Sequence, residues 1–264
     1  MAVAGSALIF SREPLERALA GVRRLGFATV ELAALEGWAH VAPSRVADDP
    51  AGETGRVAAA LTAAELRPVA INAGLGTEDP AEGRRRARAL FGMAAALGVP
   101  VVTLPAGAAG AGPGAAAARL RPFVEEAAAL GVTLAVETHM GAVTELPAAA
   151  AALCADVPGL RLTLDPSHFW AGSAQGGPWR ACIADVAHVH LRDAGLGGWP
   201  QIQVWPGRGA VDFAAVAAAL REAGYRGTQS VEYIDTLPVA LAEGRGGAAE
   251  AAAEMARQAA AWWG

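Results

Sequence analysis

The chain has 264 residues, 53% of them hydrophobic, and a formal net charge of −5. This length fits one α/β barrel or two small domains, and the apolar content is sufficient for a large core. The acidic balance argues against nucleic acid as a partner. The absence of lysine among the 21 basic residues excludes lysine Schiff-base chemistry and a Walker-type phosphate loop.

Short β-like runs alternate with Ala- and Leu-rich helical stretches along the whole chain, which is typical of repeated βα units around a parallel sheet. Eight runs are expected strands: residues 7–10, 28–32, 69–73, 101–105, 133–137, 161–165, 187–191 and 229–233. Helices are expected between them, for example over 14–27, 80–99 and 211–225. Several of these end in Leu-Gly or Ala-Gly, where glycine closes a helix in the left-handed conformation. The pattern predicts the α/β class and one (β/α)8 TIM barrel domain over residues 1–264.

The two ends of the chain and its cysteines bear on location and assembly. The apolar segment 2–10 has no basic residue before it, so a first strand is expected there rather than a signal peptide. No apolar run is long enough to cross a bilayer, so no membrane partner is expected. Cys154 and Cys182 make no CxxC or zinc spacing, which favours a cytoplasmic location. The sequence leaves open whether the chain forms a homodimer, which exposure of Trp262 and Trp263 would indicate.

Ionisable residues gather at the ends of four consecutive predicted strands, where the active sites of α/β barrels form. They are Glu137 and His139 after the fifth strand, Asp165 and His168 after the sixth, His188, His190 and Asp193 at the seventh, and Glu232 and Asp235 at the eighth. Residues two apart on a strand share a face, so His188 and His190 are expected to look into one space.

Four of these residues form a candidate metal set. Glu137, Asp165, His190 and Glu232 are separated by about one βα unit or somewhat more, as expected if consecutive strands each contribute one inward ligand. Three carboxylates and one imidazole suit one Mn²⁺ or Mg²⁺, with Co²⁺ or Zn²⁺ as alternatives, and leave room for two substrate oxygens. Structural roles stay open for single members, because Asp165 could simply cap a turn and His188 could be a hydrogen-bonded core residue.

The motifs that carry these residues are VETH (Glu137), DPSH (Asp165 and His168), HLRD (His190) and SVEY (Glu232). Together with GFATVEL at 26–32 and PGRGAVDF at 206–213, they make the sequence resemble the xylose isomerase-like TIM barrels, the sugar phosphate isomerase/epimerase family. The resemblance implies that Glu137, Asp165, His190 and Glu232 hold one divalent metal. It also implies that His168 contacts substrate oxygens, and that His188 supports His190 or contacts the substrate.

The activity that the resemblance implies is a metal-dependent sugar isomerase or epimerase of carbohydrate metabolism. A metal bound to a carbonyl and an adjacent hydroxyl acidifies the C–H between them and stabilises the enediolate. Glu137 and Glu232 are implied to face opposite sides of the substrate, so that one removes a proton and the other returns it. Return to the opposite face gives epimerisation, and return to the neighbouring carbon gives isomerisation. Loss of a β-hydroxyl gives an inosose-type dehydratase, which is the main alternative.

Aromatic residues near the same strand ends favour a small neutral sugar or polyol-derived substrate. Trp170, Trp179, Trp199 and Trp205 cluster there, and a ring such as that of Trp170 could stack on a sugar. The long segment 195–213 is expected to form a lid or substrate wall. The arginine that sugar 3-epimerases carry shortly after the metal histidine is not at the same spacing, and Arg208 is the candidate to replace it.

Two further function classes share this barrel. An endonuclease IV-like hydrolase uses three zinc ions, many histidines and basic DNA contacts, whereas this chain has five histidines and an acidic balance. A non-catalytic sugar-binding barrel is the other alternative, and loss of any one residue of the metal set from the site would favour it.

Overall fold

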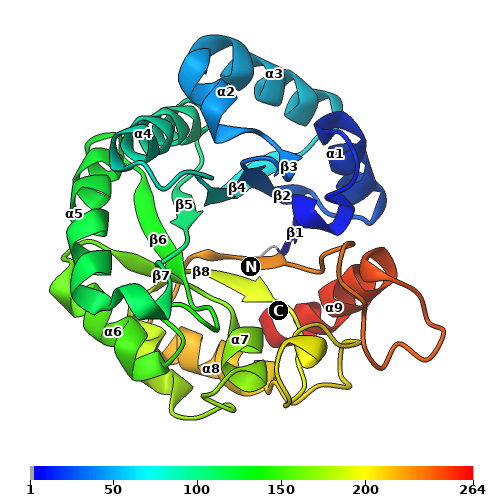
Figure 1. The fold of residues 1–264 in the computed structure, drawn as a ribbon. Helices are drawn as coiled ribbons and strands as arrows, with labels where there is room; N and C mark the ends of the chain where they lie inside the picture. Colours follow the sequence, from blue (N-terminus) through cyan, green and yellow to red (C-terminus); the bar gives the residue numbers. More distant parts are fainter. Residues whose placement is uncertain (1–2, 264) are drawn as a thin grey trace.

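The computed structural model describes residues 3–263 and shows one closed barrel of eight parallel strands surrounded by helices (Figure 1). The barrel strands are β1 (Val3–Ser6), β2 (Thr29–Leu35), β4 (Arg67–Gly74), β5 (Val101–Leu104), β6 (Thr133–Glu137), β7 (Arg161–Leu164), β8 (Val186–Leu191) and β9 (Thr228–Val231). Each strand pairs with the next, and β1 pairs with both β2 and β9, which closes the barrel. A short strand, β3 (Ala39–His40), pairs antiparallel with β2.

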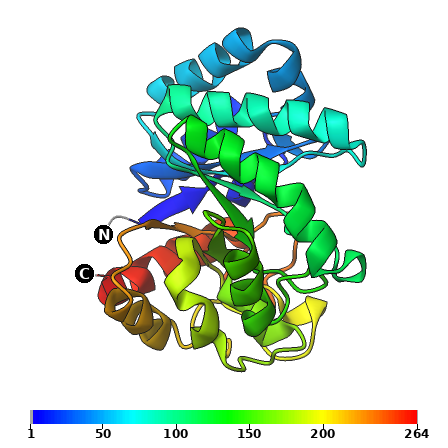
Figure 2. The same ribbon diagram turned by 90° about the vertical axis from the view of Figure 1, so that its left-hand side faces the viewer.

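The outer layer consists of helices that follow the strands in sequence. Their bounds are α1 (Leu15–Arg24), α2 (Pro43–Asp48), α3 (Pro50–Ala63), α4 (Pro80–Leu97), α5 (Pro113–Ala129), α6 (Pro147–Asp156), α7 (Pro166–Ala171), α8 (Phe213–Glu222) and α9 (Ala248–Trp263). Figure 2 shows α4 and α5 side by side along the outside of the barrel. The 3₁₀ segments are η1 (Ala7–Phe10), η2 (Ala109–Ala111), η3 (Trp179–Asp185) and η4 (Trp199–Gln201). The predicted TIM barrel is therefore confirmed.

The predicted first strand is the one element of the barrel that was misplaced. Residues 7–10 form η1, and the strand is β1, which lies directly before them. The Ser6 side chain accepts a hydrogen bond from the backbone N–H of Leu8 at 3.3 Å, which turns the chain out of the sheet. A short apolar run is buried in either conformation, so its composition could not distinguish strand from helix.

Local sequence signals explain where the helices begin and end. Six helices, α2 to α7, have proline in their first turn, where its missing N–H costs no hydrogen bond. At α4, the Asp79 carboxylate accepts the N–H of Ala81 at 2.9 Å. The same helix closes at Gly98, which has φ of +67°. The glycine endings predicted from the sequence therefore act as expected at this helix.

The C-terminal tryptophans pack against the barrel. Trp263 is buried, and the Trp262 ring is stacked on Phe213 with 5.1 Å between ring centroids. The exposure that would have indicated a homodimer is therefore not seen at these two residues. None of the helices within residues 3–263 is long and apolar enough to cross a membrane.

Two glycines of α4 give a test of these backbone assignments. We expect Gly98→Ala to destabilise the protein by about 1 kcal/mol, because a Cβ is disfavoured in the left-handed conformation at φ +67° even though nothing lies within 4 Å of it. Gly92→Ala should instead stabilise by roughly 0.5 to 1 kcal/mol, since Gly92 is inside the helix and also has open space. Urea unfolding of both variants measures the difference, and effects of equal sign would contradict the assignment.

Candidate metal centre

The carboxyl ends of β6, β7, β8 and β9 bring the four predicted metal residues to one point. Glu137 is the last residue of β6, Asp165 follows β7, His190 lies within β8 and Glu232 follows β9. Neighbouring parallel strands end at the same edge of a barrel, so these side chains converge although they are far apart in sequence. One ligand atom from each residue lies within 4.8 Å of the ligand atoms of the other three.

His190 is at the centre of this cluster. Its Nδ1 lies 3.0 Å from Glu137 Oε1, 3.6 Å from Glu232 Oε1 and 4.0 Å from Asp165 Oδ2. His190, Asp165 and Glu232 are buried, and the partly buried Glu137 faces the cavity described below. One imidazole nitrogen therefore points into a space bounded by three carboxylates, which is the donor set expected for a hard divalent cation.

Asp165 has the capping role that the sequence left open, and its second oxygen lies in the cluster. Its Oδ1 accepts hydrogen bonds from the backbone N–H of Ser167 at 2.9 Å and from the Ser167 hydroxyl at 2.5 Å, so it caps α7. Its Oδ2 points toward the cluster. Capping fixes the carboxylate in one orientation, which keeps the second oxygen directed at the candidate metal position.

Arg192 is a buried cation inside the same cluster. Its guanidinium lies 2.6 Å from Asp165 Oδ2 and 3.2 Å from Glu232 Oε2, and its Nη2 is 2.9 Å from His168 Nε2. This guanidinium is the positive charge that compensates two of the three carboxylates. Arg192, rather than the predicted Arg208, is therefore the arginine that lies in the cluster and lines the cavity.

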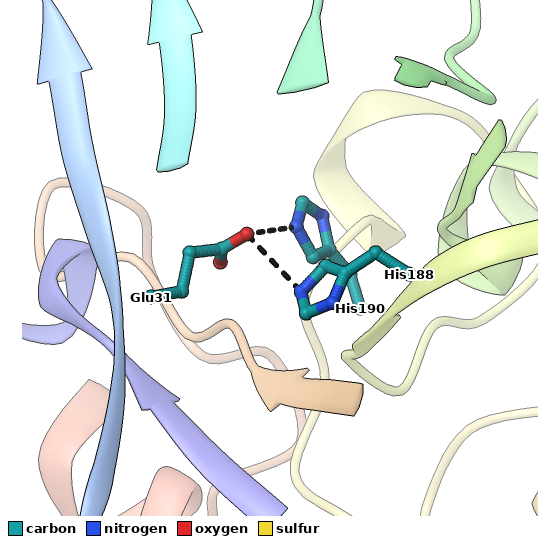
Figure 3. Close-up of side chains that lie close together, drawn as sticks. All are labelled: Glu31, His188 and His190. Carbon is teal, nitrogen blue, oxygen red and sulfur yellow. Dashed lines mark hydrogen bonds and ion pairs between the residues drawn. The ribbon is translucent and has the colours of Figure 1, made fainter. Parts of the chain in front are cut away.

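A second group of buried polar side chains lies below the cluster, around Glu31 of β2. Glu31 Oε1 is 3.0 Å from His190 Nε2 and 3.2 Å from His188 Nε2, and all three side chains are fully buried (Figure 3). His188 also lies within hydrogen-bond distance of Ser230 and Thr228, at 3.0 and 3.1 Å. The two histidines of the HVH segment thus share a face, as predicted, and both turn toward Glu31.

A cavity of about 500 Å³ opens above the cluster. Its polar floor includes Asn72, Glu137, His168, Arg192 and Glu232. Its rim carries two half-exposed tryptophans, Trp38 after β2 and Trp199 in the long segment after β8. The segment 195–213 therefore contributes a wall to the cavity through Trp199, as the sequence indicated.

Three of the predicted substrate contacts lie elsewhere. Trp170 is buried against Trp179, with 6.3 Å between ring centroids, and is not among the residues lining the cavity. The Arg208 side chain is 48% exposed, and its nearest carboxylate is Glu243 at 3.5 Å. His188 is enclosed in the barrel interior beneath His190. Of the four predicted substrate contacts, His168 is the one among the described residues that line the cavity.

Four residues of the site were missed by the sequence analysis: Glu31, Asn72, Arg192 and Trp38. Arg192 carried a signal, because it continues the two-residue spacing of His188 and His190 and so points to the same face. Glu31 and Asn72 also carried one, as single polar residues within apolar strands, where burial requires a partner. Asn72 donates a hydrogen bond to Glu232 Oε1 at 3.1 Å. Trp38 lies in a turn after β2, and no sequence pattern pointed to a role in the site.

Burial and charge determine the protonation of the cluster. Desolvation raises the pKa of Glu232 to about 8, because the positive charges of His190 and Arg192 offset it only in part. Burial opposes the charged form of His190, but the neighbouring Glu232 and Glu31 carboxylates raise its pKa well above the usual value. Burial would raise the pKa of Glu137, but its hydrogen bond from His190 lowers it. Burial also raises the pKa of Asp165, so protons on the cluster compensate its carboxylates together with the Arg192 cation.

A larger and more open groove of about 980 Å³ lies on the outside, over α3 and α4. Alanines and three arginines line much of it, and those arginines are paired: Arg84 and Arg88 with Glu126, and Arg85 with Glu82. Among the described residues, the groups of side chains that could hold a metal ion lie away from this groove, so the cavity above His190 is the candidate site.

A family model described as Xylose isomerase-like TIM barrel matches residues 19–263. The chain therefore belongs to the xylose isomerase-like TIM barrel family. No curated protein matches the sequence.

Solved structures share the fold at low sequence identity. A xylose isomerase-like TIM barrel protein from Mycobacterium smegmatis, in complex with magnesium, is 16% identical with a TM-score of 0.77, over 100% of this chain and 98% of that one. A D-allulose 3-epimerase from Methylomonas sp. is 20% identical with a TM-score of 0.71, over 99% and 97%. A probable 3-DHS dehydratase from Bacillus anthracis is 16% identical with a TM-score of 0.72, over 98% and 99%. At these identities the likeness concerns the fold.

The protonation of the cluster gives a prediction for metal binding. A metal ligand must be deprotonated, so binding of Mn²⁺ at pH 7 should release protons, among them that of Glu232 and one from the His190 imidazolium. Affinity should rise steeply with pH below about 8, and less steeply above it, because Glu232, with a pKa of about 8, then no longer holds its proton. Calorimetry in buffers of different ionisation enthalpy counts the protons. Binding with no proton release would contradict this protonation.

Proposed function

We propose that this protein is a divalent-metal-dependent isomerase or epimerase that moves a proton next to the carbonyl group of a small neutral sugar or polyol-derived compound. The observation that carries the proposal is the convergence of Glu137, Asp165, His190 and Glu232 beside one cavity. Two of these residues, Glu137 and Glu232, also line that cavity, so they can act on a molecule bound there.

The four residues fit a hard divalent cation, for which we propose Mn²⁺ or Mg²⁺. Their oxygen-rich donor set and the mutual distances below 4.8 Å support that assignment. The magnesium complex of the Mycobacterium smegmatis protein supports it by analogy. When bound, such a cation polarises a carbonyl and a neighbouring hydroxyl oxygen and stabilises the negative charge that develops on them.

The chain's own carboxylates transfer the proton. One of Glu137 and Glu232 removes a proton from the carbon next to the carbonyl, and the electron pair of that C–H bond moves toward the carbonyl oxygen. The other carboxyl group returns a proton, either to the opposite face of the same carbon or to the neighbouring carbon. In the second case the hydroxyl proton of the first carbon moves to the former carbonyl oxygen, so that the carbonyl and hydroxyl groups exchange places. The first outcome is epimerisation and the second is aldose–ketose isomerisation. The D-allulose 3-epimerase of the same fold supports the first by analogy.

Arg192 and His168 complete the floor of the cavity. Arg192 holds Asp165 and Glu232 in place through its ion pairs and adds a fixed positive charge beside the reacting oxygens. Burial lowers the pKa of His168 well below its usual value, so its ring is neutral and can hydrogen-bond a substrate hydroxyl. We propose these two residues as the substrate contacts.

The rim of the cavity favours an uncharged substrate. Trp38 and Trp199 offer aromatic faces for the C–H groups of a sugar or a cyclic polyol. Among the described residues that line the cavity, Arg192 is the one arginine, and two carboxylates already occupy its guanidinium. A phosphate group would therefore find no free cation there.

Dehydration is the second candidate, because the same proton abstraction followed by loss of a β-hydroxyl group uses the same residues. The probable 3-DHS dehydratase of the same fold favours keeping it. An endonuclease-like hydrolase is disfavoured, because the described residues that line the cavity include no free basic side chain for a nucleic-acid backbone.

Solvent exchange tests the proposal. Metal-loaded protein in D₂O with a panel of ketoses, aldoses and inososes should incorporate deuterium at a carbon next to a carbonyl, as followed by NMR. Glu232→Gln should slow this exchange by about 100-fold or more, since it removes one proton-transfer group. Glu243→Gln, at a surface glutamate paired with Arg208 and Arg245, is the matched control and should exchange at the wild-type rate.

The outcomes separate the candidates. Elimination of water from an inosose would favour the dehydratase. Absence of both exchange and elimination across the panel, in protein shown to hold the metal, would rule out the isomerase proposal for these substrates.

A further inference from the structure

We infer that Glu31 positions His190, so that the ring offers Nδ1 to the metal and keeps its proton on Nε2. The inference rests on the proposed metal site and concerns a residue outside the ligand set. Glu31 lies on β2, whereas His190 lies on β8, and two strands, β1 and β9, separate them in the barrel. The contact therefore crosses the barrel interior.

The two nitrogens of His190 face different partners. Nδ1 points to the cluster, 3.0 Å from Glu137 Oε1 and 3.6 Å from Glu232 Oε1. Nε2 lies 3.0 Å from Glu31 Oε1 on the other side of the ring (Figure 3). A neutral imidazole has one N–H and one lone pair. An acceptor fixed at Nε2 holds the proton there, which leaves the Nδ1 lone pair for the metal.

Glu31 itself is held by His188. The Nε2 of His188 lies 3.2 Å from the same Oε1, and the opposite side of the His188 ring is 3.1 Å from Thr228 Oγ1. Ser230 Oγ, 3.0 Å from His188 Nε2, adds a second contact from β9. The chain of contacts thus runs from β9 through His188 and Glu31 to His190. This explains the two-residue spacing of the histidines, since both must face the barrel interior to reach one carboxylate.

A hydrogen-bond network accounts for this trio better than a second metal ion. Glu31 and His188 are not among the described residues lining the cavity, whereas the four-residue cluster reaches the cavity through Glu137 and Glu232, so an ion entering from the cavity meets the cluster first. A carboxylate that accepts the second N–H of a ligating histidine fixes the ring and makes it a stronger ligand. Removing such a partner weakens metal binding by roughly 10- to 100-fold.

The test compares wild-type protein with Glu31→Gln, which preserves size and removes the charge. Titration with Mn²⁺ by calorimetry should give one site per chain and a loss of affinity of roughly 10- to 100-fold in the variant. Long-range ¹H–¹⁵N NMR of the diamagnetic Mg²⁺-loaded wild type should show His190 protonated at Nε2. Glu31→Asp, which retains the charge on a shorter side chain, should recover part of the affinity.

Glu36→Gln is the matched control. Glu36 follows the same strand but contacts Ser44 and Arg86 instead of the histidines, so the variant should bind Mn²⁺ as the wild type does. Equal affinities of wild type and Glu31→Gln, or ligation through Nε2, would overturn the inference. A second Mn²⁺ site in the wild type that Glu31→Gln abolishes would show that Glu31 is itself a ligand. A wild-type protein that binds no divalent metal would instead overturn the proposed function.

The Glu31→Asp variant protects the test against misfolding. If Glu31→Gln does not fold, as judged by circular dichroism, the Mn²⁺ affinity of Glu31→Asp still decides the question. A buried carboxylate without a positioning role would leave the affinity of Glu31→Asp at the wild-type value, whereas a positioning role predicts a partial loss.

Discussion

Compensation of charge inside an apolar barrel is the constraint on which the site depends. A single buried carboxylate or guanidinium is strongly unfavourable unless an opposite charge and hydrogen bonds accompany it. In this protein each buried acid of the site has such a partner: Glu31 has His188 and His190, Glu137 has His190, and Asp165 and Glu232 have Arg192. The groups are therefore interdependent, because the loss of one charge leaves its partner buried without compensation.

The barrel makes this arrangement possible because it directs strand ends to one edge. Consecutive parallel strands deliver one inward residue each, and the helix that begins directly after β7 fixes Asp165 through its cap. Inward-facing residues deeper in the barrel, the lower layer, then support the cluster residues at the strand ends, the upper layer. Glu31 and His188 belong to the lower layer, and they determine how His190 meets the cavity.

Two segments that are hydrogen-bonded to each other build part of the cavity wall. The segment after β8 carries Trp199, and the segment after β9 joins it where Trp205 N–H donates to Ala240 O at 2.8 Å. Asp193 anchors the first segment by accepting the N–H groups of Gly207 and Gly209 at 2.9 and 3.0 Å. The WPGRG stretch is thereby folded back against the barrel, which explains why Arg208 lies on its outer surface.

The sequence alone determined the barrel and the four converging residues, because both follow from local periodicity. Alternating strands and helices, glycine helix ends and ionisable residues at four strand ends are properties of neighbouring positions. The position of β1 was decided by a serine side chain that turned the chain. The partners of the site were decided by tertiary structure. Glu31, Asn72 and Trp38 come from the first half of the barrel, yet they meet residues 188–232 only when the barrel closes. Such contacts depend on which side chains face each other across the interior, and no local pattern records that.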